Sequence, residues 1–425
     1  MAADQTNSLR FGRKAITVEE AQQLILNRAE LLPAEAVPLE LAHGRRLAQS
    51  VIADHPVPHF RRSGMDGYAI RASDSLDAEA LRPVALRVTE TIPCGSVPER
   101  SVQPGEAARI MTGAVVPEGA DAVIMLEMTD KLLAGDGPEG DKVLVRKSMR
   151  MGDNITPIGQ EIGVGELLLE TGRRIGPGEA AILATFGCAE VRVHRVPRVA
   201  VFSTGSELLP IEAALEPGRI RGSNSHMLAC QIREAGGEPR LMPILPDCPE
   251  TVEAALLQAL DWADILVTTG GVSVGDKDVL VELFQRWDGE LIFNKVAMRP
   301  GSPSSFGWWR GKPLFALSGN PGASFVGFEL FVRPYLKAIQ GCARPLPREC
   351  TALLDADYGK GSAYPRYVRA RTYTEQATLK VAPAGRDKSS IMVSIKDAEC
   401  LLCIPAGGQA PPRGALVRVL QLAEA

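Results

Sequence analysis

Residues 265–278, with the sequence ILVTTGGVSVGDKD, indicate the fold class of this chain. The first five residues, Ile265–Thr269, are mostly β-branched or apolar and run directly into a glycine-rich segment, and residues 279–286 then follow a helical pattern. Such residues favour strands, and glycines after a strand allow a tight turn into a following helix. This order of strand, turn and helix is typical of one unit of a parallel α/β sheet.

The same alternation occurs on both sides of this segment. We predict further strands and helices in turn, with strands at 199–203, 240–245, 291–296 and 313–317 and helices at 224–235, 250–262 and 323–339. Strands that alternate with helices of this length are joined by right-handed crossovers, which place helices on both faces of the sheet. The sequence therefore predicts a doubly wound, mainly parallel sheet domain over residues 196–343.

The rest of the chain has other patterns. A capping box of Thr17 and Glu20 opens a helix that we expect over residues 18–32. Short apolar segments cut by Pro, Gly and Asp predict a β-rich inserted module at 55–150, and further short strands predict a small C-terminal β-domain at 344–425. Residues 15–54 and 151–195 would form a connector domain between them. We therefore expect an α/β multidomain protein.

The chain length predicts the number of domains, and the net charge argues against a nucleic-acid or membrane partner. At about 150 residues per domain, 425 residues predict two to four domains. Forty-seven basic and 51 acidic residues give a net charge of −4, which supplies no overall basic field for nucleic acid or an anionic membrane. The N-terminus has no apolar run of a signal peptide, and the longest apolar stretch is about half a membrane span. We expect a cytoplasmic protein without a nucleic-acid or membrane partner.

The eight cysteines are scattered along the chain, as expected of free thiols in a reducing compartment. Cys400 and Cys403 form one CxxC pair, but it lies in an apolar, strand-like run without a second cysteine or histidine pair nearby. Metal and redox sites need such partners. Core packing is therefore the favoured interpretation of this pair over metal or redox use.

Polar and glycine-rich residues follow the predicted strands. In an open parallel sheet, ligands bind beyond the carboxyl ends of the strands, where helix N-termini also point. Carboxylates there are hard oxygen ligands for Mg²⁺, and glycine-rich turns offer N–H groups to phosphate. Each acid alone could instead cap a helix, and each glycine could simply form a turn. Together they predict a magnesium-dependent site for a phosphorylated small molecule, with Glu207, Asp247, Asp276 and Asp278 as metal ligands and Gly270, Gly271, Ser273 and Gly275 as the phosphate cradle.

Several separate motifs between residue 16 and about residue 422 carry a family resemblance. They are LAHGRRLAQSVIA (41–53), PHFRRSGMDGYAI (58–70), RIMTGAVVPEGADAVIMLE (109–127), PRVAVFSTGSEL (197–208), TTGGVSVGDKD (268–278), MRPGSP (298–303) and SGNPGASFVGFELFVRP (318–334). With these motifs the chain resembles the MoeA family of molybdopterin molybdenumtransferases, which includes the E domain of gephyrin. The resemblance implies a sheet domain like that of MogA.

The resemblance also implies a reaction, in which molybdate is inserted into adenylylated molybdopterin and Mg²⁺-dependent cleavage of the adenylate releases AMP. Members of the family are elongated homodimers, and the molybdopterin adenylyltransferase and molybdoenzymes are further possible partners. Carried over by motif, the catalytic residues would be Asp66, Thr112, Glu207, Asp247 and Asp278. The residues that bind the pterin substrate and the anions would include the glycine cradle together with Lys295, Arg299, Asn320 and Pro321.

The chain departs from the family pattern at a few positions. Ser302 stands where the family commonly has a lysine, Ser318 where it has proline, Ala323 where it has a hydroxyl residue, and Thr156 where it often has arginine. Loss of a lysine beside an anion removes one charge-assisted contact. A second hypothesis is therefore a non-catalytic, gephyrin-like scaffold or divergent paralogue that keeps the fold and the dimer. The joint presence of the predicted catalytic and metal-binding residues favours the enzyme.

Overall fold

The computed structural model describes residues 14–132, 141–272 and 279–422. The chain divides into two compact units, each described by itself. The first, the sheet unit, comprises residues up to 49, residues 171–181 and the residues from 189 onward. The second, the inserted unit, comprises residues 50–170 and 182–188. Among the described residues, no helix combines the length and the apolar character that crossing a membrane requires.

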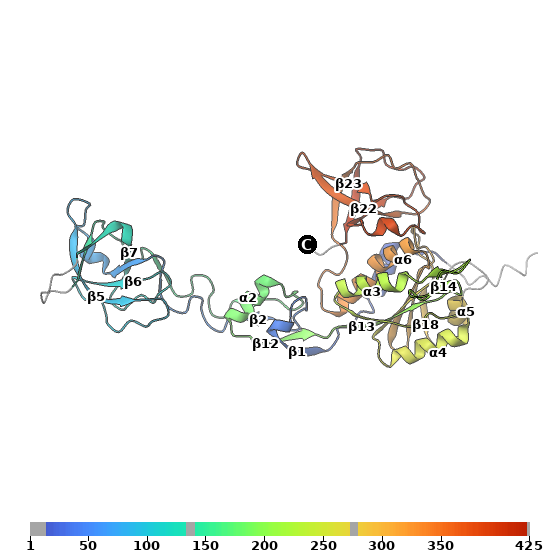
Figure 1. Cartoon of the computed structure of the whole chain (residues 1–425), viewed down its shortest axis with the longest axis horizontal. Coiled ribbons are helices and arrows are strands. Elements are labelled where there is room, and N and C mark those ends of the chain that lie inside the picture. The colour runs from blue at the N-terminus through green and yellow to red at the C-terminus, as the bar shows by residue number, and fades with distance from the viewer. Residues whose placement is uncertain (1–13, 133–140, 273–278, 423–425) are drawn as a thin grey trace, which may run out of the picture. The chain divides into compact units, whose positions relative to one another are not determined.

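The centre of the sheet unit is a six-stranded sheet (Figure 1). Its strand order is β16 (Glu238–Leu241), β13 (Arg198–Ser203), β17 (Ile265–Thr269), β20 (Lys312–Leu317), β19 (Ser305–Trp309) and β18 (Glu290–Phe293). The first four strands run parallel, whereas β19 pairs antiparallel with both β20 and β18. The sheet is therefore mainly parallel, as predicted.

Helices cover both faces of this sheet. Val199 and Val201 of β13 face one core with α3 (Asn224–Glu234) and α6 (Pro321–Gly327), while Ala200 and Phe202 face another with α4 (Pro249–Leu260) and α5 (Val279–Arg286). Successive strand residues point to opposite faces, so one short apolar strand contributes to both cores. This arrangement confirms the doubly wound prediction. A π-helix (Phe328–Val332) and α7 (Arg333–Ile339) continue from α6.

One local prediction was wrong, and one strand was not predicted. The N-terminal helix α1 spans Val18–Leu26 and does not continue to residue 32. A residue before proline is disfavoured in the helical conformation, and Leu32, which precedes Pro33, instead donates its N–H to the carbonyl of Ile339 (2.8 Å). Strand β19 lies between the predicted strands and is an additional strand of the sheet.

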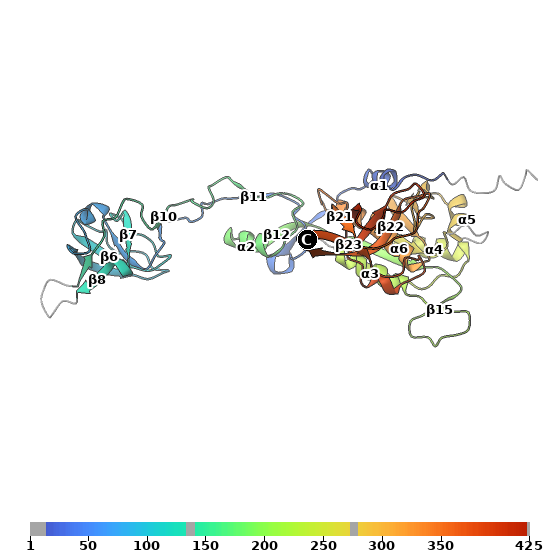
Figure 2. The same cartoon turned by 90° about the horizontal axis from the view of Figure 1, so that it is seen from above.

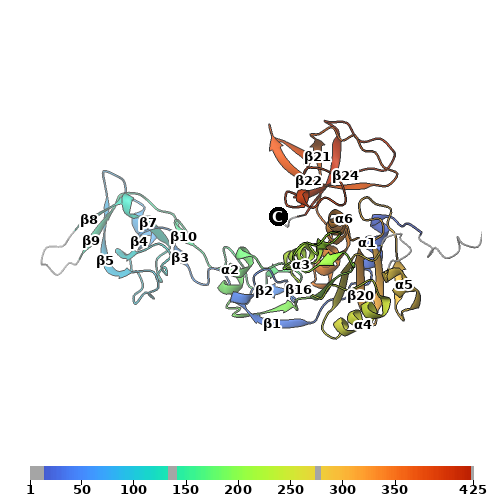
Figure 3. The same ribbon diagram turned by 45° about the vertical axis from the view of Figure 1, so that its right-hand side comes forward.

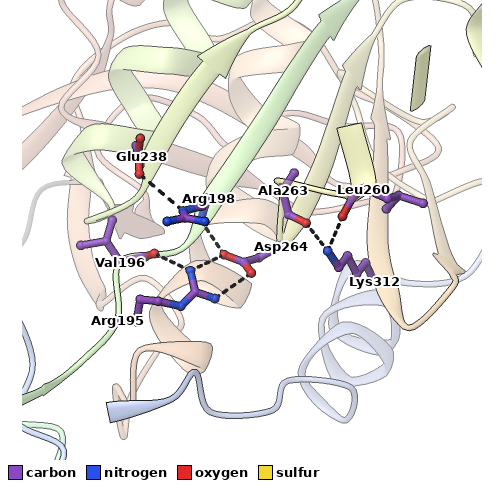
Figure 4. Close-up of polar contacts among 8 residues, drawn as sticks. All are labelled: Arg195, Val196, Arg198, Glu238, Leu260, Ala263, Asp264 and Lys312. Atoms are coloured by element: carbon purple, nitrogen blue, oxygen red, sulfur yellow. Dashed lines mark hydrogen bonds and ion pairs between the residues drawn. The ribbon is translucent and has the colours of Figure 1, made fainter. Parts of the chain in front are cut away.

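Charged side chains form hydrogen bonds and ion pairs between the N-terminal ends of the parallel strands (Figure 4). Asp264, just before β17, accepts two hydrogen bonds from the guanidinium of Arg195 (2.9 and 2.7 Å) and one from the backbone N–H of Arg198 (2.8 Å). Lys312 Nζ, at the start of β20, donates to the carbonyls of Leu260 and Ala263. Internal contacts occupy this edge, and a cavity lies at the opposite edge of the sheet.

The C-terminal part of the sheet unit is a closed five-stranded barrel beside α6 (Figure 3). Around the barrel the order is β21 (Glu349–Leu354), β23 (Thr378–Pro383), β22 (Arg366–Glu375), β24 (Cys400–Ile404) and β25 (Leu416–Gln421). Burial raises the pKa of the Cys400 and Cys403 thiols to about 12, which keeps both protonated. The CxxC pair is therefore packed into this domain, as predicted.

The inserted unit is rich in β structure, as expected. Its six-stranded sheet has the order β7 (Ala122–Met125), β4 (Gly67–Ile70), β6 (Glu106–Ile110), β5 (Val84–Ile92), β9 (Lys142–Val145) and β8 (Thr129–Leu132). Two short pairs join segments distant in sequence: β2 (Val51–Ile52) with β11 (Leu167–Leu169), and β3 (Arg62–Ser63) with β10 (Ile155–Thr156). Thr156, one of the departures from the family pattern, pairs with Arg62 there. In the sheet unit, β1 (Ala34–Pro38) pairs with β12 (Glu190–His194), and α2 (Pro177–Thr185) crosses from one unit to the other.

Candidate functional site

A cavity of about 1200 Å³ lies at the carboxyl ends of the parallel strands of the sheet unit. Its wall includes the residues after β13, β17 and β20 and the loop of residues 298–303. The structure brings eight of the predicted site residues together at this cavity, namely Glu207, Asp247, Gly270, Gly271, Lys295, Arg299, Asn320 and Pro321. The predicted residues Ser273, Gly275, Asp276 and Asp278 lie outside the described residues.

The glycine turn after β17 is required by a close backbone approach. Gly270 has a φ of +100°, and a Cβ on it would lie 2.4 Å from the carbonyl oxygen of Thr204. Any other residue would clash with the end of β13. The Gly270 N–H donates to the carbonyl of Leu317 (3.1 Å), which connects this turn to the end of β20. The turn thus holds three strand ends together at the cavity.

Two carboxylates, Glu207 and Asp247, stand at one side of the cavity. Both side chains are exposed, and neither forms an ion pair with another residue that the structure describes. Asp247 Oδ2 accepts a hydrogen bond from the backbone N–H of Ser206 (3.2 Å), which places it beside the Glu207 segment. Within the described ranges no group of three or more Asp, Glu, His or Cys residues could hold a metal ion. The described part of the site thus supplies two of the four predicted magnesium ligands.

The loop that follows Glu207 contains β14 (Leu208–Leu209) and β15 (Ile220–Arg221) and projects from the sheet domain (Figure 2). Arg219 donates to the carbonyls of Ser206 (3.4 Å) and Leu208 (3.3 Å), and the backbone N–H of Ile220 donates to the carbonyl of Glu207 (2.9 Å). These bonds hold the backbone of the segment from which Glu207 lines the cavity.

The floor of the cavity is polar. Asn224 Nδ2 donates to Thr269 Oγ1 (2.9 Å) and to the carbonyl of Gly319 (2.7 Å), and Thr269 Oγ1 donates to the carbonyl of Ser318 (3.2 Å). Ser203 and Thr204 also belong to the lining of the cavity, but their hydroxyl oxygens are buried and have no hydrogen-bond partner among the described residues. A buried hydroxyl without a partner costs free energy.

Lys295 and Arg299 also line the cavity. Lys295 is half-buried and Arg299 is exposed, and among the residues described neither side chain is engaged in a hydrogen bond or an ion pair. Ser302, one of the departures from the family pattern expected from the sequence, donates its hydroxyl to the carbonyl of Val296 (2.7 Å) within the loop that carries Arg299. The two cations are thus available to an anionic ligand.

The C-terminal barrel supplies a wall of the cavity that the sequence analysis missed. Its lining residues are Tyr364, Arg366, Asp387, Ser389, Ser390 and Met392. The barrel joins the sheet domain through backbone hydrogen bonds: the N–H of Arg299 donates to Pro365 (2.9 Å), and that of Gly322 donates to Ser389 (2.8 Å). The signal that could have drawn attention to this wall is the pair Arg366 and Arg369, which flanks the apolar residues Tyr367 and Val368 at the start of β22.

The other two predicted catalytic residues, Asp66 and Thr112, meet in the inserted unit. Asp66 Oδ1 accepts hydrogen bonds from the backbone N–H of Thr112 (2.7 Å) and from its hydroxyl (2.8 Å). These two bonds hold the pKa of Asp66 below its usual range. Both residues are exposed, so an ionised carboxylate stands at the surface of this unit.

Comparison with known proteins agrees with this architecture. Family models match three successive segments: the MoeA N-terminal region (domain I and II) at residues 16–187, a probable molybdopterin binding domain at 200–338, and the MoeA C-terminal region (domain IV) at 351–422. The second match covers the parallel sheet domain and the third covers the barrel. Sheet domain and barrel, which share the cavity, therefore correspond to separate modules of one family.

Individual relatives match over nearly the whole chain. The molybdopterin molybdenumtransferase of Staphylococcus aureus (strain MRSA252) is 40% identical over 96% of this chain and 96% of its own. That of Bacillus subtilis (strain 168) is 40% identical over 97% of this chain and 95% of its own. The crystal structure of the molybdopterin biosynthesis moeA protein from Pyrococcus horikoshii OT3 has a TM-score of 0.80 and 31% identity over 96% of this chain and 100% of that chain. These matches confirm the α/β multidomain fold class, and the chain belongs to the MoeA family of molybdopterin molybdenumtransferases, which are transferases of molybdenum cofactor biosynthesis.

Proposed function

We propose that this protein inserts molybdate into adenylylated molybdopterin with Mg²⁺-dependent release of AMP. The observation that carries the proposal is a single cavity that has two unpaired cations, Lys295 and Arg299, and two unpaired carboxylates, Glu207 and Asp247, within the described part of the chain. The two cations can bind an oxyanion such as molybdate. The two carboxylates can bind the Mg²⁺ that accompanies a pyrophosphate. The names of the relatives support the same reaction class.

In this proposal the basic side of the cavity binds molybdate. Lys295 offers a point charge and Arg299 a planar fork that can donate two parallel hydrogen bonds to an oxyanion. Arg366 reaches the same cavity from the barrel. Asn320 and Pro321, also in the wall, would contact the pterin substrate beside the molybdate.

The acidic side of the cavity would hold Mg²⁺. Glu207 and Asp247 fit this role because they are exposed carboxylates without a cationic partner among the residues described, and hard oxygen donors are the ligands that Mg²⁺ prefers. When bound, Mg²⁺ neutralises charge on the adenylate pyrophosphate and so favours its cleavage. Asp276 and Asp278 complete the proposed ligand set on the basis of the sequence, and the glycine turn beginning at Gly270 would cradle the phosphate.

We further propose that Asp66 and Thr112 serve this reaction from the second subunit of a homodimer. This part rests on the family resemblance and on the ionised state of Asp66. The eight free cysteines support a reducing, cytoplasmic setting for the enzyme. The molybdopterin adenylyltransferase would supply the substrate, and molybdoenzymes would receive the product.

The experiment that tests the function combines purified protein, adenylylated molybdopterin, Mg²⁺ and molybdate, and follows AMP release and cofactor formation. We expect AMP release that requires Mg²⁺ and is lost in Glu207→Ala. Glu216→Ala is the matched control, because Glu216 is an exposed acid of the same loop that pairs with Arg219 and does not line the cavity. No AMP release by the wild-type protein under any of these conditions would favour the scaffold hypothesis.

A further inference from the structure

The guanidinium of Arg366 forms hydrogen bonds with two residues of the barrel, Tyr358 and Asp387. Arg366 Nε donates to the hydroxyl oxygen of Tyr358 (2.9 Å), and Arg366 Nη2 donates to Asp387 Oδ2 (2.8 Å). The Tyr358 hydroxyl donates to the same Asp387 oxygen, which closes a three-membered network. Arg366 Nη1 donates to no residue in the described part of the chain, so one nitrogen of this cavity-lining side chain remains for a ligand.

This network is largely removed from solvent. Tyr358 is 8% exposed, and the side chains of Asp387 and Arg366 are 7% and 18% exposed. If Arg366 rotated away, the buried Tyr358 hydroxyl and the buried Asp387 carboxylate would each lose a hydrogen-bond partner. Such a loss in a buried charged network costs free energy, so other orientations of Arg366 are disfavoured. Arg366 is therefore confined to an orientation in which its Nε and Nη2 atoms are occupied.

We propose that Tyr358 and Asp387 are positioning residues that hold Arg366 in the orientation in which it binds the oxyanion substrate. The inference rests on the proposed function, since it assigns the anion of that reaction to this side of the cavity. Asp387 balances the charge of Arg366, so the contribution of Arg366 to anion binding depends on a correctly directed hydrogen bond more than on net charge.

Tyr358→Phe is the clean test of this idea. It removes one hydroxyl, which is both the acceptor for Arg366 Nε and a donor to Asp387, and it leaves every charge in place. Asp387→Asn is less simple, because removal of a negative charge near the cavity favours anion binding while loss of orientation opposes it. It serves as the second variant, since asparagine keeps an acceptor oxygen for Arg366.

The barrel offers a matched control with the same chemistry at another place. The hydroxyl of Tyr373 donates to Asp355, and Arg413 donates to Asp355 Oδ1 through Nε (2.9 Å) and Nη2 (2.7 Å). None of these three residues lines the cavity. Tyr373→Phe therefore removes an equivalent Tyr–Asp hydrogen bond from the same barrel without touching Arg366.

The experiment measures the dissociation constant for molybdate by calorimetry and the molybdate dependence of AMP release. We expect Tyr358→Phe to weaken molybdate binding about five- to ten-fold, and Tyr373→Phe to change it by less than about two-fold. The molybdate concentration for half-maximal rate should change more than the maximal rate does. In an Arg366→Ala background, Tyr358→Phe should have no further effect on binding, because the two residues act through one contact.

Melting temperatures of all variants separate positioning from barrel stability. Equal molybdate affinities in Tyr358→Phe and Tyr373→Phe, with a lower melting temperature in the former, would show that the network only stabilises the barrel and would overturn the inference. Unchanged affinity in Arg366→Ala, or absence of molybdate binding by the wild-type protein, would also overturn it. Weakened molybdate binding in Tyr358→Phe without any AMP release by wild type would contradict the proposed reaction and leave the positioning role standing.

Discussion

Arg299 of the sheet domain and Arg366 of the barrel are neighbours in a parallel β-bridge. The backbone N–H of Arg299 donates to Pro365 (2.9 Å), and that of Tyr367 donates back to Arg299 (2.8 Å). Arg299 and Arg366 are far apart in sequence, but this β-bridge makes them neighbours and both line the same cavity. Main-chain hydrogen bonds hold the two backbones side by side, so the sheet domain and the barrel each contribute an arginine to the lining of the same cavity.

Replacement of Glu207 by alanine should abolish Mg²⁺-dependent AMP release and leave the fold intact. Glu207 is exposed and makes no ion pair among the described residues, so its removal costs little packing or charge pairing. We expect the melting temperature to stay within about 2 °C of wild type. Asp278→Ala should behave in the same way, although Asp278 lies outside the described residues. Parallel losses of activity and melting temperature would indicate a structural role instead.

Asp66→Ala and Glu207→Ala should complement each other if the proposed dimer combines them in one site. In a randomised pool about half of the dimers are hybrids, and each hybrid has one intact site of two, so about a quarter of the wild-type activity should return. The activity of the mixture is compared with that of each variant alone, after subunit exchange has been verified. No recovery in exchanged dimers would show that each site is built from one chain.

Ser302→Lys should restore the family cation and lower the molybdate concentration for half-maximal insertion by about ten-fold at low salt. The gain should shrink as salt rises, since a solvent-reachable ion pair is screened. The same substitution also removes the hydrogen bond from Ser302 to Val296, so Ser302→Ala is the control for that loss. If molybdate dependence is the same in all three proteins, the anion binds elsewhere.

The stability of the sheet unit should fall in acid partly because of Asp387. Burial alone raises its pKa, but the hydrogen bonds from Tyr358 and Arg366 prevail and hold the pKa of this carboxyl below its usual range. A carboxyl group with a lowered pKa stabilises the fold above its unfolded pKa, and this contribution is lost as the pH falls through the folded pKa. Urea unfolding between about pH 5 and pH 2 should therefore show a shallower acid loss in Asp387→Asn than in wild type. Identical slopes would contradict the assignment.

Glu329→Ala should destabilise the sheet unit without acting at the cavity. Glu329 is 1% exposed and accepts hydrogen bonds from Arg333 Nε (2.6 Å) and Nη2 (2.8 Å) and from Gln231 (2.7 Å). Removal of one partner of a buried ion pair costs about 3 to 5 kcal/mol. Chemical denaturation measures the loss, and Glu234→Ala, which removes the exposed second acid near Arg333, should cost under about 1 kcal/mol.

The sequence by itself determined the features that depend on residues close together in the chain. The run Ile265–Thr269 followed by Gly270 and Gly271 specifies a strand and its turn, because side-chain shape and backbone freedom act locally. The carboxyl ends of parallel strands share one edge, so the sequence also placed Glu207 and Asp247 at one cavity. Motifs spread over the chain were enough to identify the family.

Tertiary structure alone decided the features that depend on distant partners. The N–H of Leu32 bonds to the carbonyl of Ile339, and the antiparallel β19 pairs with both β18 and β20. The barrel wall with Arg366 depends on the junction with Arg299. Local patterns report only on neighbours within a few residues, whereas these contacts join segments tens to hundreds of residues apart, whose meeting is set by packing of the whole unit.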